Sequence, residues 1–163
     1  MKLFGLVGRN IEYSFSRNFF RNKFEKENIK ALYQNFDLQN LDQFRSILQQ
    51  NPELKGLNVT IPYKEQILSY LDEIDPVAEK IGAVNTIKIL QSGALIGFNT
   101  DYYGFMEALK PHLKKHHSHA LILGTGGASK AIAYALNEMD ISYHNVSRTP
   151  SQDQLSYNSL TRE

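Results

Sequence analysis

One stretch of this chain, Ala120-Leu-Ile-Leu-Gly124-Thr-Gly126-Gly127-Ala-Ser129-Lys-Ala131, constrains the fold more than any other. A short aliphatic run breaks at glycines and then resumes as a helical pattern, which predicts a buried strand, a tight turn and a helix. Glycine adopts backbone conformations closed to other residues, and the amides at a helix N-terminus attract phosphate. The stretch therefore indicates a nucleotide-binding turn, with an ordinary strand-to-helix turn as the alternative.

The next predicted strand, Ile141 to Val146, indicates which nucleotide. A fold that prefers NAD usually carries an acid at the end of this strand, but here Ser147-Arg148-Thr149 follows. A guanidinium pairs with a 2′-phosphate in a fork, so these residues favour NADP. The candidate cofactor-binding residues are Gly124, Thr125, Gly126, Gly127, Ala128, Ser147, Arg148 and Thr149.

Composition limits the partners of the chain. Its 163 residues suffice for one well-buried domain or two small ones. The 18 Lys and Arg residues nearly balance the 17 Asp and Glu residues, so no overall field recruits nucleic acid or an anionic membrane. The absence of cysteine excludes disulfides and thiolate metal sites and fits a reducing compartment. No apolar run approaches the roughly 20 residues that span a bilayer, so we expect a soluble, cytoplasmic protein.

Alternating patterns predict an α/β domain before the glycine stretch. Strands are expected near residues 3–7 and 31–38, and helices near residues 17–28 and 41–48, with Ser16 capping the first helix. This order implies a parallel or mixed sheet. The histidine-containing segment 111–119 is expected to link a first domain, residues 1–110, to a second, residues 111–163. A zinc site at these histidines ranks below a solvated linker, because neither cysteine nor carboxylate is nearby.

Polar residues gather at predicted strand ends and helix starts, where open α/β sheets place their ligand contacts. They are Ser14, Ser16, Thr60, Lys64, Asn85 and Asp101. Pro62 suits the first position of a helix, which puts Lys64 in its first turn. There the helix dipole opposes a cation and favours proton donation. A solvated surface lysine is the alternative for Lys64, and a plain helix cap is the alternative for Asp101.

Four ordered motifs resemble the signatures of the shikimate dehydrogenase family. They are Asn58-Val-Thr-Ile-Pro62-Tyr-Lys64, Ile81-Gly-Ala-Val-Asn85-Thr86, Gly97-Phe-Asn99-Thr-Asp101-Tyr-Tyr-Gly104-Phe105 and Leu123-Gly-Thr-Gly-Gly-Ala-Ser129-Lys-Ala131. The resemblance implies an N-terminal α/β substrate domain with a mixed, mostly parallel sheet, followed by a truncated Rossmann-like dinucleotide-binding domain. It also implies reversible, NADP-dependent reduction of 3-dehydroshikimate to shikimate in aromatic amino-acid biosynthesis.

The resemblance assigns roles to the polar residues. Lys64 and Asp101 are expected to form the catalytic acid-base pair, in which Asp101 orients Lys64 and holds its charge state. The expected substrate-binding residues are Ser14, Ser16, Thr60, Lys64, Asn85 and Asp101. No metal is expected in this site.

Departures from the family pattern leave alternatives open. Tyr13 and Arg17 replace a histidine and a proline of the family's first motif, so quinate is an alternative substrate. The family's sequence also continues for many residues beyond the last motif matched here. The chain is then either part of a longer protein or a short relative that completes its site by association, for example as a homodimer. A binding module without turnover is the remaining alternative.

Overall fold

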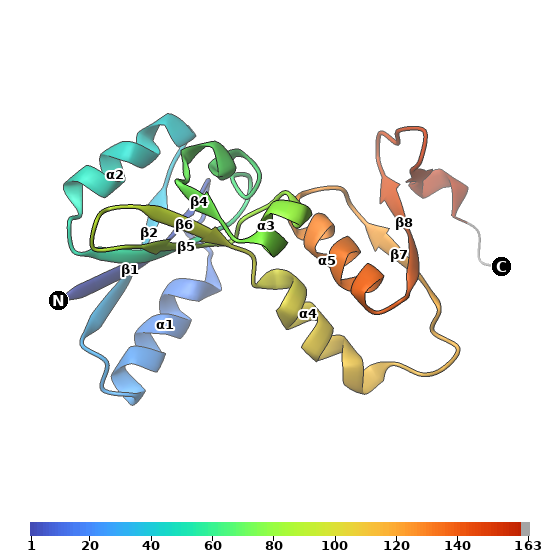
Figure 1. Cartoon of the computed structure of the whole chain (residues 1–163), viewed down its shortest axis with the longest axis horizontal. Helices are drawn as coiled ribbons and strands as arrows, with labels where there is room; N and C mark the ends of the chain where they lie inside the picture. The colour runs from blue at the N-terminus through green and yellow to red at the C-terminus, as the bar shows by residue number, and fades with distance from the viewer. Residues whose placement is uncertain (161–163) are drawn as a thin grey trace. The chain divides into compact units, whose positions relative to one another are not determined.

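The structure, a computed structural model, describes residues 1–160 and divides the chain into two units, Met1–Asn99 and Thr100–Glu163. Both units combine helices with a sheet (Figure 1). The first unit contains β1 (Lys2–Gly8), α1 (Phe15–Lys26), β2 (Ala31–Asp37), η1 (Leu41–Gln43), α2 (Phe44–Gln50), β3 (Leu54–Val59), η2 (Gln66–Tyr70), β4 (Glu73–Ile74), α3 (Pro76–Ile81), β5 (Thr86–Ile89) and β6 (Leu95–Phe98), where η marks a 3-10 helix.

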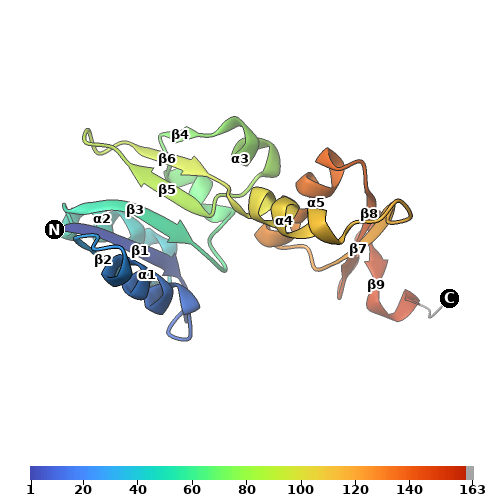
Figure 2. The same ribbon diagram turned by 90° about the horizontal axis from the view of Figure 1, so that it is seen from below.

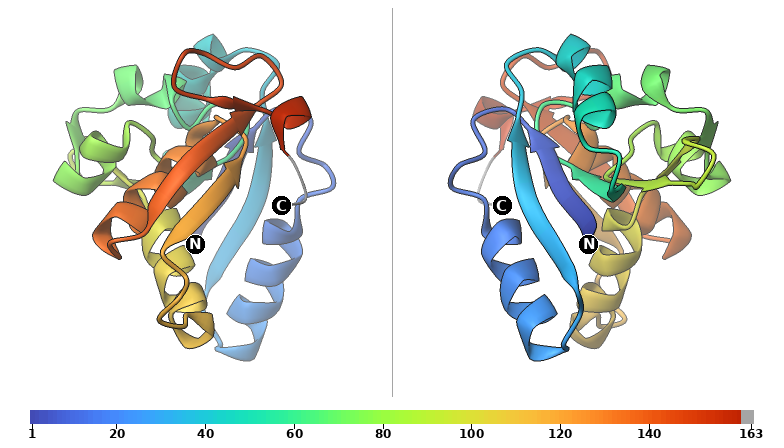
Figure 3. Two further views of the ribbon diagram at one scale, coloured as in Figure 1. Left: turned by 90° about the vertical axis from the view of Figure 1, so that its right-hand side faces the viewer. Right: turned by 90° about the vertical axis from the view of Figure 1, so that its left-hand side faces the viewer.

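The sheet of the first unit is mixed, with strand order β2-β1-β3-β5-β6-β4. β1 lies between β2 and β3 and runs parallel to both, as the right-hand view of Figure 3 shows for β1 and β2. β5 runs antiparallel to β3 and pairs with β6 in a hairpin (Figure 2). The parallel or mixed sheet predicted from the order of strands and helices is present.

The two faces of this sheet are covered differently. α1 and α2 lie on opposite faces (Figure 1). The face that carries α2 holds the main core, in which Val7, Phe44 and Ile87 are almost fully buried. α1 has no fully buried residue, and its aromatic side chains instead pack sideways, Phe20 on Tyr33 with 4.5 Å between ring centroids. The face under α1 is therefore lined by aromatic rings rather than by a closed aliphatic core.

The second unit contains α4 (Asp101–Leu109), η3 (Lys110–His112), β7 (His119–Leu123), α5 (Gly127–Glu138), β8 (Ser142–Ser147), β9 (Leu155–Ser156) and η4 (Tyr157–Ser159). Its three strands are parallel, in the order β7-β8-β9, and β7 and β8 run side by side in the left-hand view of Figure 3. The predicted strand, glycine turn and helix are present as β7, residues 124–126 and α5. The segment after Thr149 contributes the short strand β9.

The division between the units falls earlier in the chain than the boundary of 110/111 proposed from the sequence. Thr100 opens the second unit, because α4 packs against α5 through Tyr102 and Tyr134, whose rings meet edge-on at 5.4 Å. Phe105 and Leu109 of α4 also pack on the core of the second sheet. α4 therefore belongs with the second unit rather than with the first.

Two local predictions in the first unit are wrong. Ser14, not Ser16, caps α1, because Ser14 is extended and its Oγ accepts a hydrogen bond from the Ser16 N–H at 3.2 Å. Lys64 does not lie in the first turn of a helix. Pro62 follows a cis peptide bond within a turn, and the 3-10 helix η2 begins only at Gln66. The helix-dipole argument for Lys64 therefore does not apply.

Within residues 1–160, the helices are too short or too polar to cross a lipid bilayer.

Candidate functional site

The loop after β1 carries both candidate serines. The carboxylate of Asp37, at the end of β2, accepts hydrogen bonds from the backbone N–H groups of Asn10 and Ile11 at 2.9 and 3.0 Å. The side-chain amide of Asn35 donates to the carbonyl oxygen of Ile11 at 3.0 Å. These bonds fix the loop against β2, and the Ser14 N–H then donates back to Ile11. The start of α1, with its two serines, is thereby held at the carboxyl end of β1.

Backbone hydrogen bonds bring the other candidate residues of the first unit to the same edge of the sheet. The Thr60 N–H donates to the carbonyl oxygen of Val7 at 2.9 Å. The carbonyl oxygen of Asn85 accepts from the Val59 N–H at 2.8 Å, and that of Lys64 accepts from the residue before Asn85, also at 2.8 Å. Asn85 itself is buried. β5 is antiparallel, so its beginning meets the ends of β1 and β3.

The structure shows where the candidate residues of the first unit lie, and their roles remain predictions. Three separate segments, residues 9–16, 60–64 and 83–86, converge at one sheet edge, as expected for a ligand site in an open α/β sheet. The candidates at this edge are Ser14, Ser16, Thr60, Lys64 and Asn85. Asp101 lies in the other unit, where it is the half-buried first residue of α4. Thr100 precedes it at the cap position and makes no side-chain capping bond.

A chain of polar side chains crosses the sheet and links Asn85 to three residues that were not candidates, Tyr33, Asn58 and Thr86. The Tyr33 hydroxyl donates to Oδ1 of Asn58 at 2.8 Å. The Asn58 amide donates to Oγ1 of Thr86 at 3.3 Å, and the Thr86 hydroxyl donates to Oδ1 of Asn85 at 3.0 Å. Asn58 alone could have been found from the sequence, because it stands two residues before Thr60 and so on the same face of the strand.

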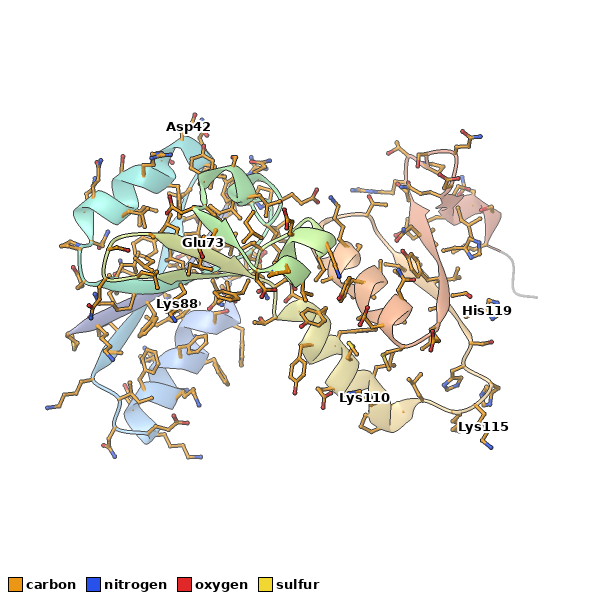
Figure 4. The ribbon with its side chains drawn as sticks, in the orientation of Figure 1. Asp42, Glu73, Lys88, Lys110, Lys115 and His119 are labelled. Atoms are coloured by element: carbon orange, nitrogen blue, oxygen red, sulfur yellow. The ribbon has the colours of Figure 1, made fainter. Side chains whose placement is uncertain are left out.

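The same three side chains, Tyr33, Asn58 and Thr86, line a cavity of about 350 Å³ on the α1 face. Most of its remaining wall is apolar, including rings of α1 and β1. Lys88 of β5, which is labelled in Figure 4, also lines the cavity. None of the five candidates at the sheet edge lines it. The cavity therefore adjoins the site through the polar chain and is a separate feature.

The glycine loop of the second unit leaves the start of α5 open. Gly124 has a φ of +131°, which a residue with a side chain rarely adopts. Gly126 has an ordinary φ of −82° and stands at the cap position of α5, where it makes no side-chain capping bond. A Cβ atom placed on Gly126 would meet no protein atom within 4 Å. The first amides of α5 therefore face space that a phosphate could occupy.

The predicted partner of the 2′-phosphate comes next to this loop. Leu123 pairs with Val146 in the parallel ladder, so the ends of β7 and β8 are adjacent. Ser147 is buried and its Oγ accepts from the Thr149 N–H at 3.3 Å, while Arg148 between them is exposed. Glycine turn, open helix start and exposed guanidinium form a donor set that fits the phosphates of a dinucleotide.

The histidines of the linker show no metal-binding arrangement. His116 and His117 lie edge-on at 4.3 Å, and Lys115 and His119 are exposed in this segment (Figure 4). Among residues 1–160, no group of three His, Asp or Glu side chains is placed to hold a metal ion.

Comparison with known proteins adds independent evidence. The chain is 45% identical over 159 residues to a shikimate dehydrogenase (NADP(+)) of Clostridium botulinum, covering 94% of this chain and 60% of that protein. Shikimate dehydrogenase 1 from Peptoclostridium difficile superposes with a TM-score of 0.87 and 38% identity, over 97% of this chain and 61% of that one.

A Thermus thermophilus shikimate 5-dehydrogenase, solved in complex with NADP(H) and shikimate, superposes with a TM-score of 0.82 and 35% identity. That likeness covers 94% of this chain and 58% of the other. The predicted fold class, a mostly parallel α/β domain followed by Rossmann-like strands, is confirmed by these likenesses. The chain spans about 60% of the length of the relatives it matches. Residues 6–87, half of the chain, match the shikimate dehydrogenase substrate binding domain, and the chain therefore belongs to the shikimate dehydrogenase family.

Proposed function

We propose that this chain provides the substrate site, the acid-base pair and the first nucleotide contacts of an NADP-dependent shikimate dehydrogenase. The observation that carries the proposal is the convergence of residues 9–16, 60–64 and 83–86 at one sheet edge through backbone hydrogen bonds. Family membership supports the substrate class, because the matched residues 6–87 cover these three segments. The reaction is the reversible reduction of 3-dehydroshikimate to shikimate.

The side chains at this edge suit a small polyhydroxylated acid. Ser14, Ser16 and Thr60 offer hydroxyl groups, and Asn85 offers an amide, so each can donate to or accept from a substrate hydroxyl or carboxylate. Such a site rejects an analogue that lacks a hydroxyl, because the missing group leaves a buried polar partner unpaired. We assign substrate binding to these four residues together with Lys64 and Asp101.

Reduction of a ketone adds a hydride to the carbonyl carbon and a proton to the carbonyl oxygen. NADPH, when bound, supplies the hydride. In this proposal Lys64 donates the proton to the oxygen and is reprotonated from water, and in the reverse direction it accepts that proton. In this proposal Asp101 orients the ammonium group of Lys64. A positioned general acid contributes roughly 10²- to 10⁴-fold to such a step.

The second unit holds the cofactor in this proposal. The amides of Gly127 and Ala128 and the open space at Gly126 accommodate the pyrophosphate. Gly124 and Thr125 shape the turn. Arg148 pairs with the 2′-phosphate, with hydroxyl donation from Ser147 and Thr149.

Quinate is a second candidate substrate. The observation that favours it is the pair of changes in the loop after β1, where Tyr13 and Arg17 replace the histidine and proline of the family pattern. Both side chains are exposed beside the serine-bearing start of α1, where they could meet the substituents of a ring acid. Relative rates on shikimate and quinate decide between the two.

The cellular setting follows from composition. The absence of cysteine and the formal charge of +1 support a cytoplasmic enzyme that acts on small molecules, without a nucleic-acid or membrane partner. A homodimer also remains a prediction, and light scattering coupled to size-exclusion chromatography measures it.

The deciding experiment follows nicotinamide absorbance when the chain receives shikimate with NADP, and then with NAD. We expect turnover that prefers NADP and falls by at least roughly 100-fold in Lys64→Ala. Lys80→Ala, which removes an exposed lysine of α3, is the matched control and should keep the full rate. Calorimetric titration of shikimate separates the remaining outcomes: binding without turnover would support a binding module, and folded protein without binding would refute the proposal.

A further inference from the structure

We propose that Tyr33 is a positioning residue of the substrate site, which orients Asn85 through a hydrogen-bond chain over Asn58 and Thr86. The inference rests on the proposed function, because Asn85 is a substrate-binding residue only there. It concerns residues of the first unit alone.

The chain of hydrogen bonds has a single direction. Tyr33 donates to Asn58 at 2.8 Å, Asn58 to Thr86 at 3.3 Å, and Thr86 to Asn85 at 3.0 Å. Hydrogen bonds that pass donation in one direction polarise one another, so a chain of this kind acts as a unit.

Packing holds the Tyr33 ring in addition to the bonds that its hydroxyl makes. The side chain leaves β2 and passes over β1, which lies between β2 and β3, to reach Asn58. Phe20 of α1 stacks on the ring with 4.5 Å between centroids and 14° between planes. Burial raises the pKa of the Tyr33 phenol, and the nearby Ser16 side chain offsets a smaller part of that shift. The hydroxyl therefore stays protonated and keeps its place as a donor.

The chain selects one orientation for each amide. Asn58 and Asn85 could each present either the oxygen or the NH₂ group to a ligand. Because Tyr33 donates to Oδ1 of Asn58, the Asn58 amide must donate to Thr86. Because Thr86 donates to Oδ1 of Asn85, the NH₂ group of Asn85 is turned away from the chain. Without the Tyr33 or Thr86 hydroxyl, the Asn85 amide can take either orientation. Substrate binding is then weaker, while the nucleotide site is unchanged.

The test is calorimetric titration of shikimate, and separately of NADP, into the full chain and its variants. Tyr33→Phe keeps the stacked ring and removes the hydroxyl, and Thr86→Val breaks the chain at its other end while keeping a β-branched side chain. We expect each to raise the shikimate Kd by roughly two- to tenfold, the range of one net hydrogen bond. The NADP Kd should not change. Thr86→Ser, which retains the hydroxyl, should bind nearly as tightly as the unmodified chain.

Two further variants separate positioning from general stability. The Tyr70 hydroxyl donates to Asp42 at 3.2 Å, and the Tyr70 ring packs edge-on against Phe44, on the opposite face of the sheet. Tyr70→Phe should leave the shikimate Kd unchanged. The double variant Tyr33→Phe/Thr86→Val should lose less affinity than the two single losses combined, because both break one chain.

Three outcomes would count against the inference. Shikimate binding that is unchanged in both Tyr33→Phe and Thr86→Val would overturn it and leave the proposed function standing. Equal weakening by Tyr70→Phe would reduce the effect to general stability and overturn it as well. If the unmodified folded chain binds no shikimate, the proposed function fails first and the inference falls with it. Should Tyr33→Phe not fold, Thr86→Val against Thr86→Ser decides the matter alone.

Discussion

The backbone N–H of Gly124 donates to the carbonyl oxygen of Val146 at 2.9 Å. This bond ties the glycine loop after β7 to the end of β8, directly before Ser147 and Arg148. The glycine loop and the backbone that leads into Arg148 are therefore held together, and the parallel pairing of Leu123 with Val146 extends this connection. A dinucleotide that contacts the α5 start with its pyrophosphate is positioned to meet Arg148 with its adenosine ribose.

Arg148→Ala should weaken NADP binding far more than NAD binding. Arg148 is exposed, so its removal leaves the core intact, and only NADP carries the phosphate it pairs with. A hydrogen bond to a charged group contributes about 1.5–3 kcal/mol, so the NADP Kd should rise roughly 10- to 100-fold. Calorimetric titration of both nucleotides measures the ratio. Arg148→Lys should recover part of the loss, and an equal loss for NAD and NADP would refute the phosphate-pairing role.

Gly126→Ala should impair the nucleotide site while sparing the fold. Its φ of −82° suits any residue and its Cβ would face open space, so the melting temperature should hold or rise slightly. A methyl group in the space that we propose for the pyrophosphate should reduce the binding free energy of NADP by about 1–3 kcal/mol. That is roughly a 5- to 100-fold rise in the NADP Kd.

Gly124→Ala provides the contrast to Gly126→Ala. Its φ of +131° disfavours a side chain, so unfolding should become easier by about 1–3 kcal/mol. Thermal denaturation and nucleotide titration of both variants test the pair. If Gly126→Ala bound NADP like the unmodified chain, the open space would not be the pyrophosphate site.

Asp37→Ala should loosen the loop that carries Ser14. It removes the acceptors for the N–H groups of Asn10 and Ile11. Because the Asp37 carboxylate is exposed, we expect a loss of only about 1 kcal/mol in the free energy of unfolding. The shikimate Kd should rise with it, since the loop positions both serines. Glu53→Ala, an equal charge change at another exposed site, is the control. A lower melting temperature with unchanged shikimate Kd would mean that anchoring this loop does not serve binding.

Local patterns predicted the elements whose residues carry their own periodicity. The run from Ala120 to Leu123 and the glycines after it were sufficient for β7 and the start of α5. Local patterns gave wrong predictions where two residues, or two backbone conformations, suit the same stretch of sequence equally well. Ser14 and Ser16 can both cap a helix, and only the extended backbone at Ser14 decides between them. Proline suits a turn as well as a helix start, and the turn at Pro62 is anchored by the burial of Tyr63, whose hydroxyl donates to Leu38 at 2.6 Å.

Features that depend on distant residues could not be predicted. Tyr33 and Asn58 are 25 residues apart in the sequence. They come within reach of each other only in the folded sheet, where β2, β1 and β3 lie side by side. β9 is two residues long and forms only by pairing with β8, so no local signal marks it. The same limit applies to α4, whose assignment to the second unit depends on packing against α5. The sequence supplied candidate residues, and the sheet order supplied their neighbours.

Tyr33 should also make the stability of the chain depend on alkaline pH. Burial raises the pKa of its phenol above the ordinary value of 10.0. Above that value the unfolded chain loses the proton while the folded chain keeps it, so the unfolded state binds fewer protons and stability falls as the pH rises. The contribution is fully present below pH 10 and is lost toward the raised pKa.

Tyr33→Phe lacks this titration, so its free energy of unfolding should fall less steeply than that of the unmodified chain between roughly pH 9 and 11. Urea unfolding at several pH values measures both slopes, and groups common to the two proteins cancel in the difference. Tyr157→Phe, which alters an exposed phenol, should leave the slope unchanged. Parallel slopes for Tyr33→Phe and the unmodified chain would mean that the Tyr33 hydroxyl is solvated in the folded protein, and that it does not hold the hydrogen-bond chain to Asn85.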